Sequence, residues 1–275
     1  MQAFAYRLRQ FLRFYAAADT RYQVHSPLVF ELANEVLEDR RPFYAFRDVE
    51  RIRARMLQST VQLDIEDFGA ASEGASPLLR RGSLAEQVRV AASSPRKGRL
   101  LFRLANWLKP ETMLELGTSA GIGALYLASA ARQAQFISLE GSESLAQVAR
   151  ANLGILDVQR RAEVRTGAFR DTLEPALQKL KHVDLVYFDG HHRREPTLAY
   201  AEQCLRYVRN QSVLVFDDVY WSAEMTGAWR QIQQHPRVTL TVDFFDLALA
   251  FVNPDFKTRQ HFCLVPGSWK PWKMR

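Results

Sequence analysis

The chain has 275 residues, of which 47% are hydrophobic and 24% are charged, and its formal net charge is +7. These values are ordinary for a globular protein with a sizeable core, and they exclude a chain that is disordered throughout. No apolar run approaches the roughly 20 residues that cross a bilayer, and no secretion signal is recognisable, so we expect a cytoplasmic protein.

The N-terminal region carries most of the excess positive charge. Residues 1–110 hold 18 Lys/Arg and 12 Asp/Glu. A basic surface of this kind can attract nucleic acid or an anionic membrane surface, but a solvated basic face explains the same excess. The arginines are scattered and lack interleaved aromatic residues that would stack on bases, which gives a nucleic-acid partner little support.

Helical patterns dominate the first hundred residues. We expect helices over residues 2–17, 28–38, 46–58, 84–92 and 97–108. Residues 61–66 predict a short strand, and residues 69–77 have the composition of a loop, either a lid over a functional site or a plain connector. We therefore predict a mainly helical N-terminal extension or lid over residues 1–96, with room for a homodimer interface, and a second domain over residues 97–275.

Strand-like and helical patterns alternate in the second domain. Apolar runs predict strands at residues 112–116, 136–139, 162–166, 183–188 and 212–216, and helical patterns separate them. Such alternation predicts an α/β fold in which helices cover both faces of a doubly wound, mostly parallel sheet. Residues 238–244, 247–252 and 261–265 are further strand-like runs with no helix between them. We expect these runs to pair antiparallel at the edge of the sheet.

A glycine turn follows the first of the predicted parallel strands. Glu115 stands near the end of this strand, and residues 117–121 (Gly-Thr-Ser-Ala-Gly) lead into the next helix. Glycines allow positive φ and a close approach of the backbone to a ligand. The N–H groups at the start of a helix favour an anionic group. By itself, the turn is suited to the pyrophosphate of a dinucleotide or to a carboxylate.

An acidic residue, Glu140, ends the second predicted strand, 19 residues after Gly121. A carboxylate at this place can accept hydrogen bonds from both hydroxyls of a ribose, which favours an adenosine-containing cofactor. Residues 117–123 also resemble the glycine pattern of short-chain dehydrogenases, which need a Tyr-x-x-x-Lys pair. None of the nine tyrosines is followed by lysine four residues later, which counts against a short-chain dehydrogenase.

The motif over residues 115–121 resembles the first motif of class I S-adenosylmethionine-dependent methyltransferases, especially the catechol-type small-molecule O-methyltransferases. Some uncharacterised bacterial relatives are similar over the N-terminal extension too. The resemblance implies a Rossmann-like fold with S-adenosylmethionine as the cofactor. Its methionine part would lie in the glycine turn, its ribose at Glu140 and its adenine at the turn after the third strand. The cofactor-binding residues that the resemblance implies are Glu115, Gly117, Thr118, Ser119, Gly121, Glu140, Gly167, Ala168, Phe169 and Asp189.

Carboxylates follow the fourth and fifth predicted strands. Asp189 comes after the fourth strand, and Asp217 and Asp218 come after the fifth. Carboxyl ends of parallel strands meet at one edge of a sheet, and oxygen ligands there suit Mg²⁺ or another divalent cation. The resemblance implies the same residues as metal ligands, with Asp218 where the family has asparagine. In the alternative interpretation, Asp217 or Asp218 caps the following helix.

His192 stands where the catechol-type family has its catalytic lysine. A neutral imidazole can accept the proton of a substrate hydroxyl, but the histidine could instead bind Glu195 or solvent. We predict metal-assisted O-methylation of a small hydroxylated substrate, with His192 and Asp189 as catalytic residues. The alternatives are a methyltransferase acting on RNA or on a lipid headgroup, and a non-catalytic module that binds S-adenosylmethionine.

Overall fold

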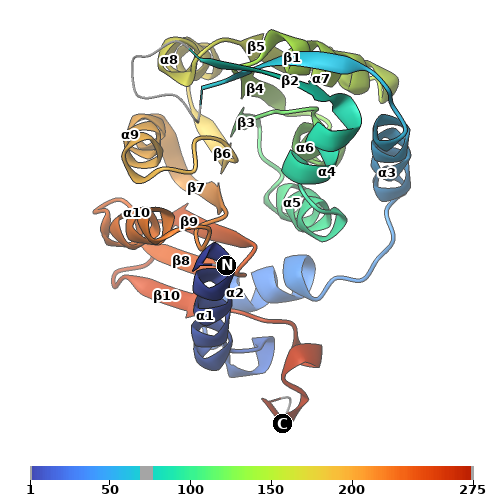
Figure 1. The fold of residues 1–275 in the computed structure, drawn as a ribbon. Coiled ribbons are helices and arrows are strands. Elements are labelled where there is room, and N and C mark those ends of the chain that lie inside the picture. The colour runs from blue at the N-terminus through green and yellow to red at the C-terminus, as the bar shows by residue number, and fades with distance from the viewer. Residues whose placement is uncertain (1, 69–76, 274–275) are drawn as a thin grey trace. The chain divides into compact units, whose positions relative to one another are not determined.

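A computed structural model of the protein describes residues 2–68 and 77–273, and the chain divides into two compact parts (Figure 1). Residues 41–191 form one unit, called here the central part. Residues 1–40 and 192–275 form the other, called the terminal part. Each part contains strands and the helices that pack on them, and each is described by itself.

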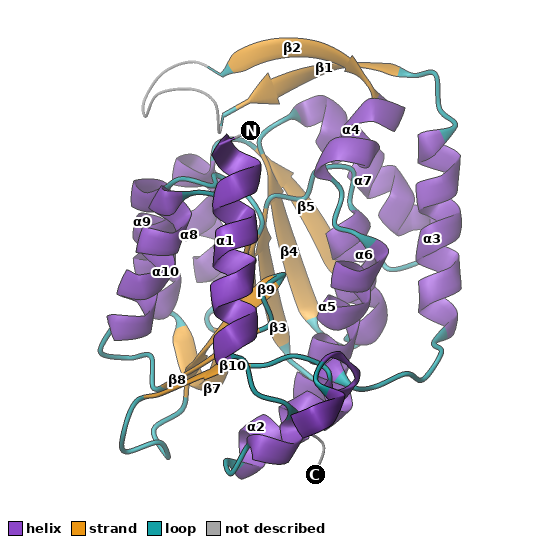
Figure 2. Ribbon diagram, turned by 60° about the horizontal axis from the view of Figure 1, so that its bottom comes forward, coloured by secondary structure: helices purple, strands orange, loops and turns teal. Residues whose placement is uncertain are grey.

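The central part contains a parallel sheet with the strand order β6-β3-β4-β5. In Figure 2, α5 and α6 lie on one side of these strands and α8 on the other. This cover explains why every residue of β3 is buried and apolar residues dominate it. The elements are α3 Tyr44–Leu57, β1 Gln62–Asp67, β2 Leu78–Ser83, α4 Leu84–Ala91, α5 Pro95–Leu108, β3 Thr112–Leu116, α6 Ile122–Ala130, β4 Gln135–Glu140, α7 Glu143–Ile155, β5 Ala162–Thr166, α8 Phe169–Leu180 and β6 Val183–Phe188.

A separate antiparallel hairpin is formed by β1 and β2. The predicted strand at residues 61–66 corresponds to β1, whereas no strand was expected at β2, Leu78–Ser83. Both leucines and both arginines at the start of β2 are exposed, so this strand lacks the alternation of buried and exposed residues that marks a half-buried strand. The loop predicted over residues 69–77 lies outside the described residues except for Pro77.

The terminal part contains the strand order β10-β8-β9-β7. Strand β9 pairs antiparallel with both β7 and β8, as expected for the C-terminal runs. The elements are α1 Gln2–Ala17, η1 Arg21–Gln23, α2 Pro27–Leu32, the π-helix η2 Ala33–Leu37, α9 Arg194–Leu205, β7 Val208–Asp217, α10 Ala223–Gln234, β8 Leu240–Asp243, β9 Leu247–Val252, β10 Gln260–Cys263, η3 Gly267–Trp269 and η4 Pro271–Lys273.

The expected antiparallel pairing of the last strand is wrong, because β10 pairs parallel with β8. Strand β9 already has β7 on one edge and β8 on the other, so no edge of β9 is open. The chain does reverse its direction after β9. It then joins the outer edge of β8, which also runs opposite to β9, and the new pair is therefore parallel.

The predicted fold class is confirmed: the sheet is mostly parallel, helices flank it, and antiparallel pairs occur among the C-terminal strands. The expected helices of the N-terminal region are present as α1 to α5, and α5 runs across the predicted boundary between residues 96 and 97. That domain boundary stays a prediction. Within residues 2–68 and 77–273, no helix has both the length and the apolar character of a membrane span.

Candidate active site

The glycine turn after β3 packs tightly on the end of β6. Gly117 and Gly121 have φ values of 103° and 88°, which favour glycine. A Cβ atom on Gly117 would lie 2.4 Å from the carbonyl oxygen of Asp189, so a larger residue would displace the backbone there. The N–H groups of Gly117 and Thr118 donate to the carbonyl oxygen of Leu139 at the end of β4. The turn is thus fixed by both neighbouring strands.

Glu140, at the end of β4, bonds directly to the glycine turn. Its side chain is buried, and its Oε2 accepts the N–H of Ser119 at 2.6 Å while Oε1 accepts the N–H of Ser142 at 3.0 Å. Burial raises the pKa of Glu140, and these N–H groups oppose the shift. A carboxylate offers about four acceptor positions, and the backbone N–H groups of Ser119, Ser142 and Gly141 bond to this one, so capacity for a further hydrogen bond remains. Glu140 therefore suits the hydroxyls of a ribose.

Glu115 lies beneath the turn at the end of a chain of hydroxyl groups. The hydroxyl of Ser138 donates to Oε2 of Glu115 at 2.5 Å, and Thr118 Oγ1 lies 2.5 Å from Ser138 Oγ. Because Ser138 has a single hydroxyl proton, Thr118 donates to Ser138 when Ser138 donates to Glu115. Glu115 is 1% exposed, and its Oε1 has no hydrogen-bond partner within the described chain. A contact between Glu115 and a cofactor stays a prediction.

Replacing Glu115 with glutamine is expected to flatten part of the pH dependence of stability. Burial raises the pKa of Glu115 from 4.5 to about 8. The unfolded chain releases this proton near pH 4.5 and the folded chain only near pH 8, so wild type loses stability as the pH rises through this window. The slope is roughly 1.4 kcal/mol per pH unit.

Denaturant unfolding of wild type and Glu115→Gln at several pH values across this window measures the difference in unfolding free energy. We expect the difference to grow with pH in favour of the glutamine variant. A difference that does not change with pH would show that Glu115 is already ionised in the folded chain.

The turn after β5 is bonded to the end of β4, where Glu140 lies. Gly167 has a φ of 136°, and its N–H donates to the carbonyl oxygen of Glu140 at 2.9 Å. Ala168 is half-buried, and Phe169, the first residue of α8, is 7% exposed. The Phe169 ring packs 5.3 Å from the ring of His191 and closely against Gly190. Phe169 thus helps to hold the segment after β6, and its contact with the cofactor stays a prediction.

The carboxylate of Asp189 is held by two side chains that the sequence did not reveal. The hydroxyl of Tyr187 donates to Oδ2 of Asp189 at 3.0 Å, and the hydroxyl of Ser93 does so at 3.4 Å. Tyr187 stands two residues before Asp189, so the alternation of a strand was a signal for their proximity. Ser93 is 96 positions away, and no local pattern indicates it.

His192, Asp217 and Asp218 belong to the terminal part, whereas Asp189 belongs to the central part. Asp217 ends β7, is 2% exposed, and accepts the N–H of Asp218 at 2.7 Å. Asp218 has a φ of 49° and forms an ion pair with Arg7 at 3.6 Å. His192 is half-buried and precedes α9. The joint binding of a cation by Asp189, Asp217 and Asp218 stays a prediction, and so does the role of His192 as the base.

The alternative role of the two aspartates as caps of the next helix is wrong. Helix α10 begins at Ala223, and Ser222 is its N-cap residue. The Ser222 hydroxyl accepts the N–H of Met225 at 3.1 Å. The helix therefore satisfies an N-terminal donor through serine, and the carboxylates of Asp217 and Asp218 are not used for this purpose.

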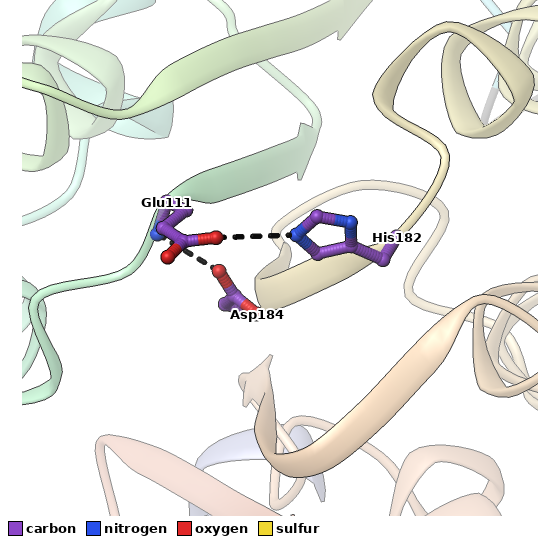
Figure 3. A group of neighbouring side chains, drawn as sticks. All are labelled: Glu111, His182 and Asp184. Atoms are coloured by element: carbon purple, nitrogen blue, oxygen red, sulfur yellow. Dashed lines mark hydrogen bonds and ion pairs between the residues drawn. The ribbon is translucent and has the colours of Figure 1, made fainter.

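A second group of ionisable side chains lies at the amino ends of the parallel strands, away from the glycine turn at their carboxyl ends (Figure 3). Glu111, His182 and Asp184 lie at the amino ends of β3 and β6, and each has a ligand atom within 4.8 Å of the others. Asp184 Oδ2 accepts the N–H groups of Glu111 and Thr112 at 2.8 and 3.1 Å. His182 lies 3.7 Å from the Glu111 carboxylate. These bonds fix the start of β3, which gives Asp184 a structural role.

A comparison with known protein families finds a match that includes the glycine turn. Residues 114–219 match the family described as "Methyltransferase domain". This part of the chain is thus similar to a methyltransferase domain. This segment begins within β3 and ends just beyond β7, so it includes the glycine turn, Glu140 and the three aspartates.

Two curated relatives are similar over about half of the chain. The chain is 35% identical over 142 residues to a catechol O-methyltransferase of Mycobacterium tuberculosis, which covers 51% of this chain and 62% of the relative. It is 30% identical over 145 residues to a catechol O-methyltransferase of Niastella koreensis, which covers 52% of this chain and 65% of the relative. The match thus spans less than two thirds of either relative's length.

A solved structure shares the fold over a larger share of the chain. It is an O-methyltransferase from Bacillus cereus in complex with SAH (S-adenosylhomocysteine), 21% identical in sequence, with a TM-score of 0.55. The similarity covers 77% of this chain and 91% of that chain. It confirms the Rossmann-like methyltransferase fold.

Proposed function

We propose that this protein is an S-adenosylmethionine-dependent O-methyltransferase of a small hydroxylated substrate. The observation that carries the proposal is the buried carboxylate of Glu140, bonded through Ser119 to the glycine turn of a methyltransferase domain. It places an acceptor for ribose hydroxyls next to a backbone turn that can approach a ligand closely. The curated relatives, both named catechol O-methyltransferases, support a catechol as the acceptor class.

The residues of the proposed cofactor site have separate roles. The turn from Gly117 to Gly121 holds the methionine part through its backbone, with Thr118 and Ser119 at its centre. Glu140 holds the ribose, and the turn at Gly167 lies beside the adenine. When bound, the cofactor would supply a methyl group on a positively charged sulfur, and transfer of that group to the acceptor oxygen would leave S-adenosylhomocysteine. The protein contributes chiefly by aligning the two reactants.

The acceptor oxygen must lose a proton during the transfer. In this proposal, His192 accepts the proton of the acceptor hydroxyl. Asp189, Asp217 and Asp218 are the residues that would hold a divalent cation such as Mg²⁺, since all their donor atoms are carboxylate oxygens. The cation would supply positive charge that favours the ionised form of the hydroxyl.

Calorimetric titration with S-adenosylhomocysteine, with and without Mg²⁺, tests the proposal. We expect one binding event without the metal, and methyl transfer from S-adenosylmethionine to catechol that stops when a chelator is added. Failure of the wild-type protein to bind S-adenosylhomocysteine would contradict the central proposal. Turnover that survives the chelator would contradict only the metal assistance, and binding without transfer to any acceptor would favour a non-catalytic module.

The basic excess of residues 1–110 favours a second candidate, a methyltransferase of RNA or of a lipid headgroup. Binding to RNA or to anionic vesicles that weakens steeply with salt would support it. The cytoplasmic location and the homodimer expected from the sequence also stay predictions.

A further inference from the structure

The strand β1 from the N-terminal region is attached to the residues that follow Glu140. The hydroxyl of Ser144 donates to the carbonyl oxygen of Asp64 at 2.7 Å. The N–H of Glu143, at the start of α7, donates to the carboxylate of Glu66 at 3.0 Å. Figure 1 shows β1 running beside α7. These bonds hold the end of β1 next to the turn that follows Glu140.

The first residue after β1, Phe68, covers the glycine that follows Glu140. A Cβ atom on Gly141 would lie 2.5 Å from Cδ2 and 3.1 Å from Cε2 of the Phe68 ring. Gly141 therefore provides the space that the ring occupies, because any side chain there would collide with it. Phe68 itself is only half-buried, although it is a large apolar residue.

We propose that Phe68 provides an aromatic contact to the nucleoside of the cofactor. The inference rests on the proposed function, in which Glu140 binds the ribose. A nucleoside held by Glu140 would lie beside the next residue, Gly141. Because Gly141 has no side chain, it cannot contact the nucleoside through one, and the Phe68 ring lies over Gly141 instead. An aromatic ring stacks on any base without needing hydrogen bonds. Phe68 lies outside the matched segment 114–219, so the N-terminal region would complete the cofactor site.

The neighbouring residue agrees with this placement. The negative charge of Asp67 is one of the causes that raise the pKa of Glu140, after burial. Asp67 is the last residue of β1, so the end of this strand is close enough for its charge to act on the Glu140 carboxylate. The end of β1 thus brings a charge to Glu140 and an aromatic ring to Gly141.

Titration of S-adenosylhomocysteine into Phe68 variants tests the proposal. We expect about tenfold weaker binding for Phe68→Ala and a similar loss for Phe68→Leu, which keeps apolar bulk but has no ring. Phe68→Tyr should bind like wild type. Leu79→Ala, at a residue of the same hairpin that is 76% exposed, is the matched control and should also bind like wild type.

A fluorescence measurement separates stacking from simple packing. In Phe68→Trp, S-adenosylhomocysteine should quench the emission that the introduced indole adds to that of the wild-type tryptophans, because the base would stack on the new ring. A role confined to holding β1 predicts no such quenching. If Phe68→Ala fails to fold, the leucine and tryptophan variants still decide the question.

The outcomes also separate this inference from the proposed function. Wild-type protein that does not bind S-adenosylhomocysteine would contradict the proposed function. Wild-type protein that binds it, together with unchanged affinity in Phe68→Leu and no quenching in Phe68→Trp, would overturn the role of Phe68 alone.

Discussion

Replacing Asp217 with alanine is expected to reduce methyl transfer to catechol by roughly 10² to 10³, the usual loss when a preorganised electrostatic group is removed. Binding of S-adenosylhomocysteine should stay near that of wild type, because Asp217 is not among the predicted cofactor-binding residues. The side chain is buried at the end of β7, and its Oδ1 accepts the N–H of Asp218. The measurement is kcat with catechol beside the calorimetric Kd for S-adenosylhomocysteine.

Two variants control for loss of structure. Asp217→Asn keeps the shape of the side chain and an oxygen for the Asp218 N–H, so it should fold normally and yet lose most of the turnover. Asp184→Asn changes an aspartate at the amino end of β6, where its carboxylate fixes the start of β3, and it should lower stability without abolishing kcat. Full turnover in Asp217→Asn would remove Asp217 from the proposed machinery.

Replacing Glu140 with alanine should weaken the binding of S-adenosylhomocysteine by about a hundredfold. Hydrogen bonds to a charged group contribute about 1.5–3 kcal/mol each, and the variant loses those to the ribose. It also loses the bond from Ser119, which helps to fix the glycine turn. Because the loss falls on cofactor binding, a high concentration of S-adenosylmethionine should restore much of the turnover.

Glu140→Gln retains a carbonyl oxygen but not the charge, so its affinity should lie between those of wild type and Glu140→Ala. The control is Glu163→Ala on β5, where the carboxylate pairs with Arg165 and Lys179 and has no proposed contact with the cofactor. Equal affinity in wild type and Glu140→Ala would show that the ribose is held elsewhere.

The order of strand, glycine turn and helix was predictable because it depends on short-range geometry. The apolar run 112–116 and the glycines at 117 and 121 correspond to β3 and to positive φ values. The position of Glu140 at the end of β4 followed from the same periodicity. Strand periodicity and backbone freedom are properties of neighbouring residues, so the sequence by itself determined the fold class and the position of the glycine turn.

Other features depend on contacts between distant residues, and only the tertiary structure decided them. Strand β10 pairs with β8 because β9 has no open edge. Ser93 bonds to Asp189, and Phe68 fills the space above Gly141, although each pair is far apart in the sequence. The burial that raises the pKa of Glu115 likewise arises from packing beneath α6. Such contacts require the folded chain, since local periodicity specifies which face a residue occupies and not which distant side chain meets it there.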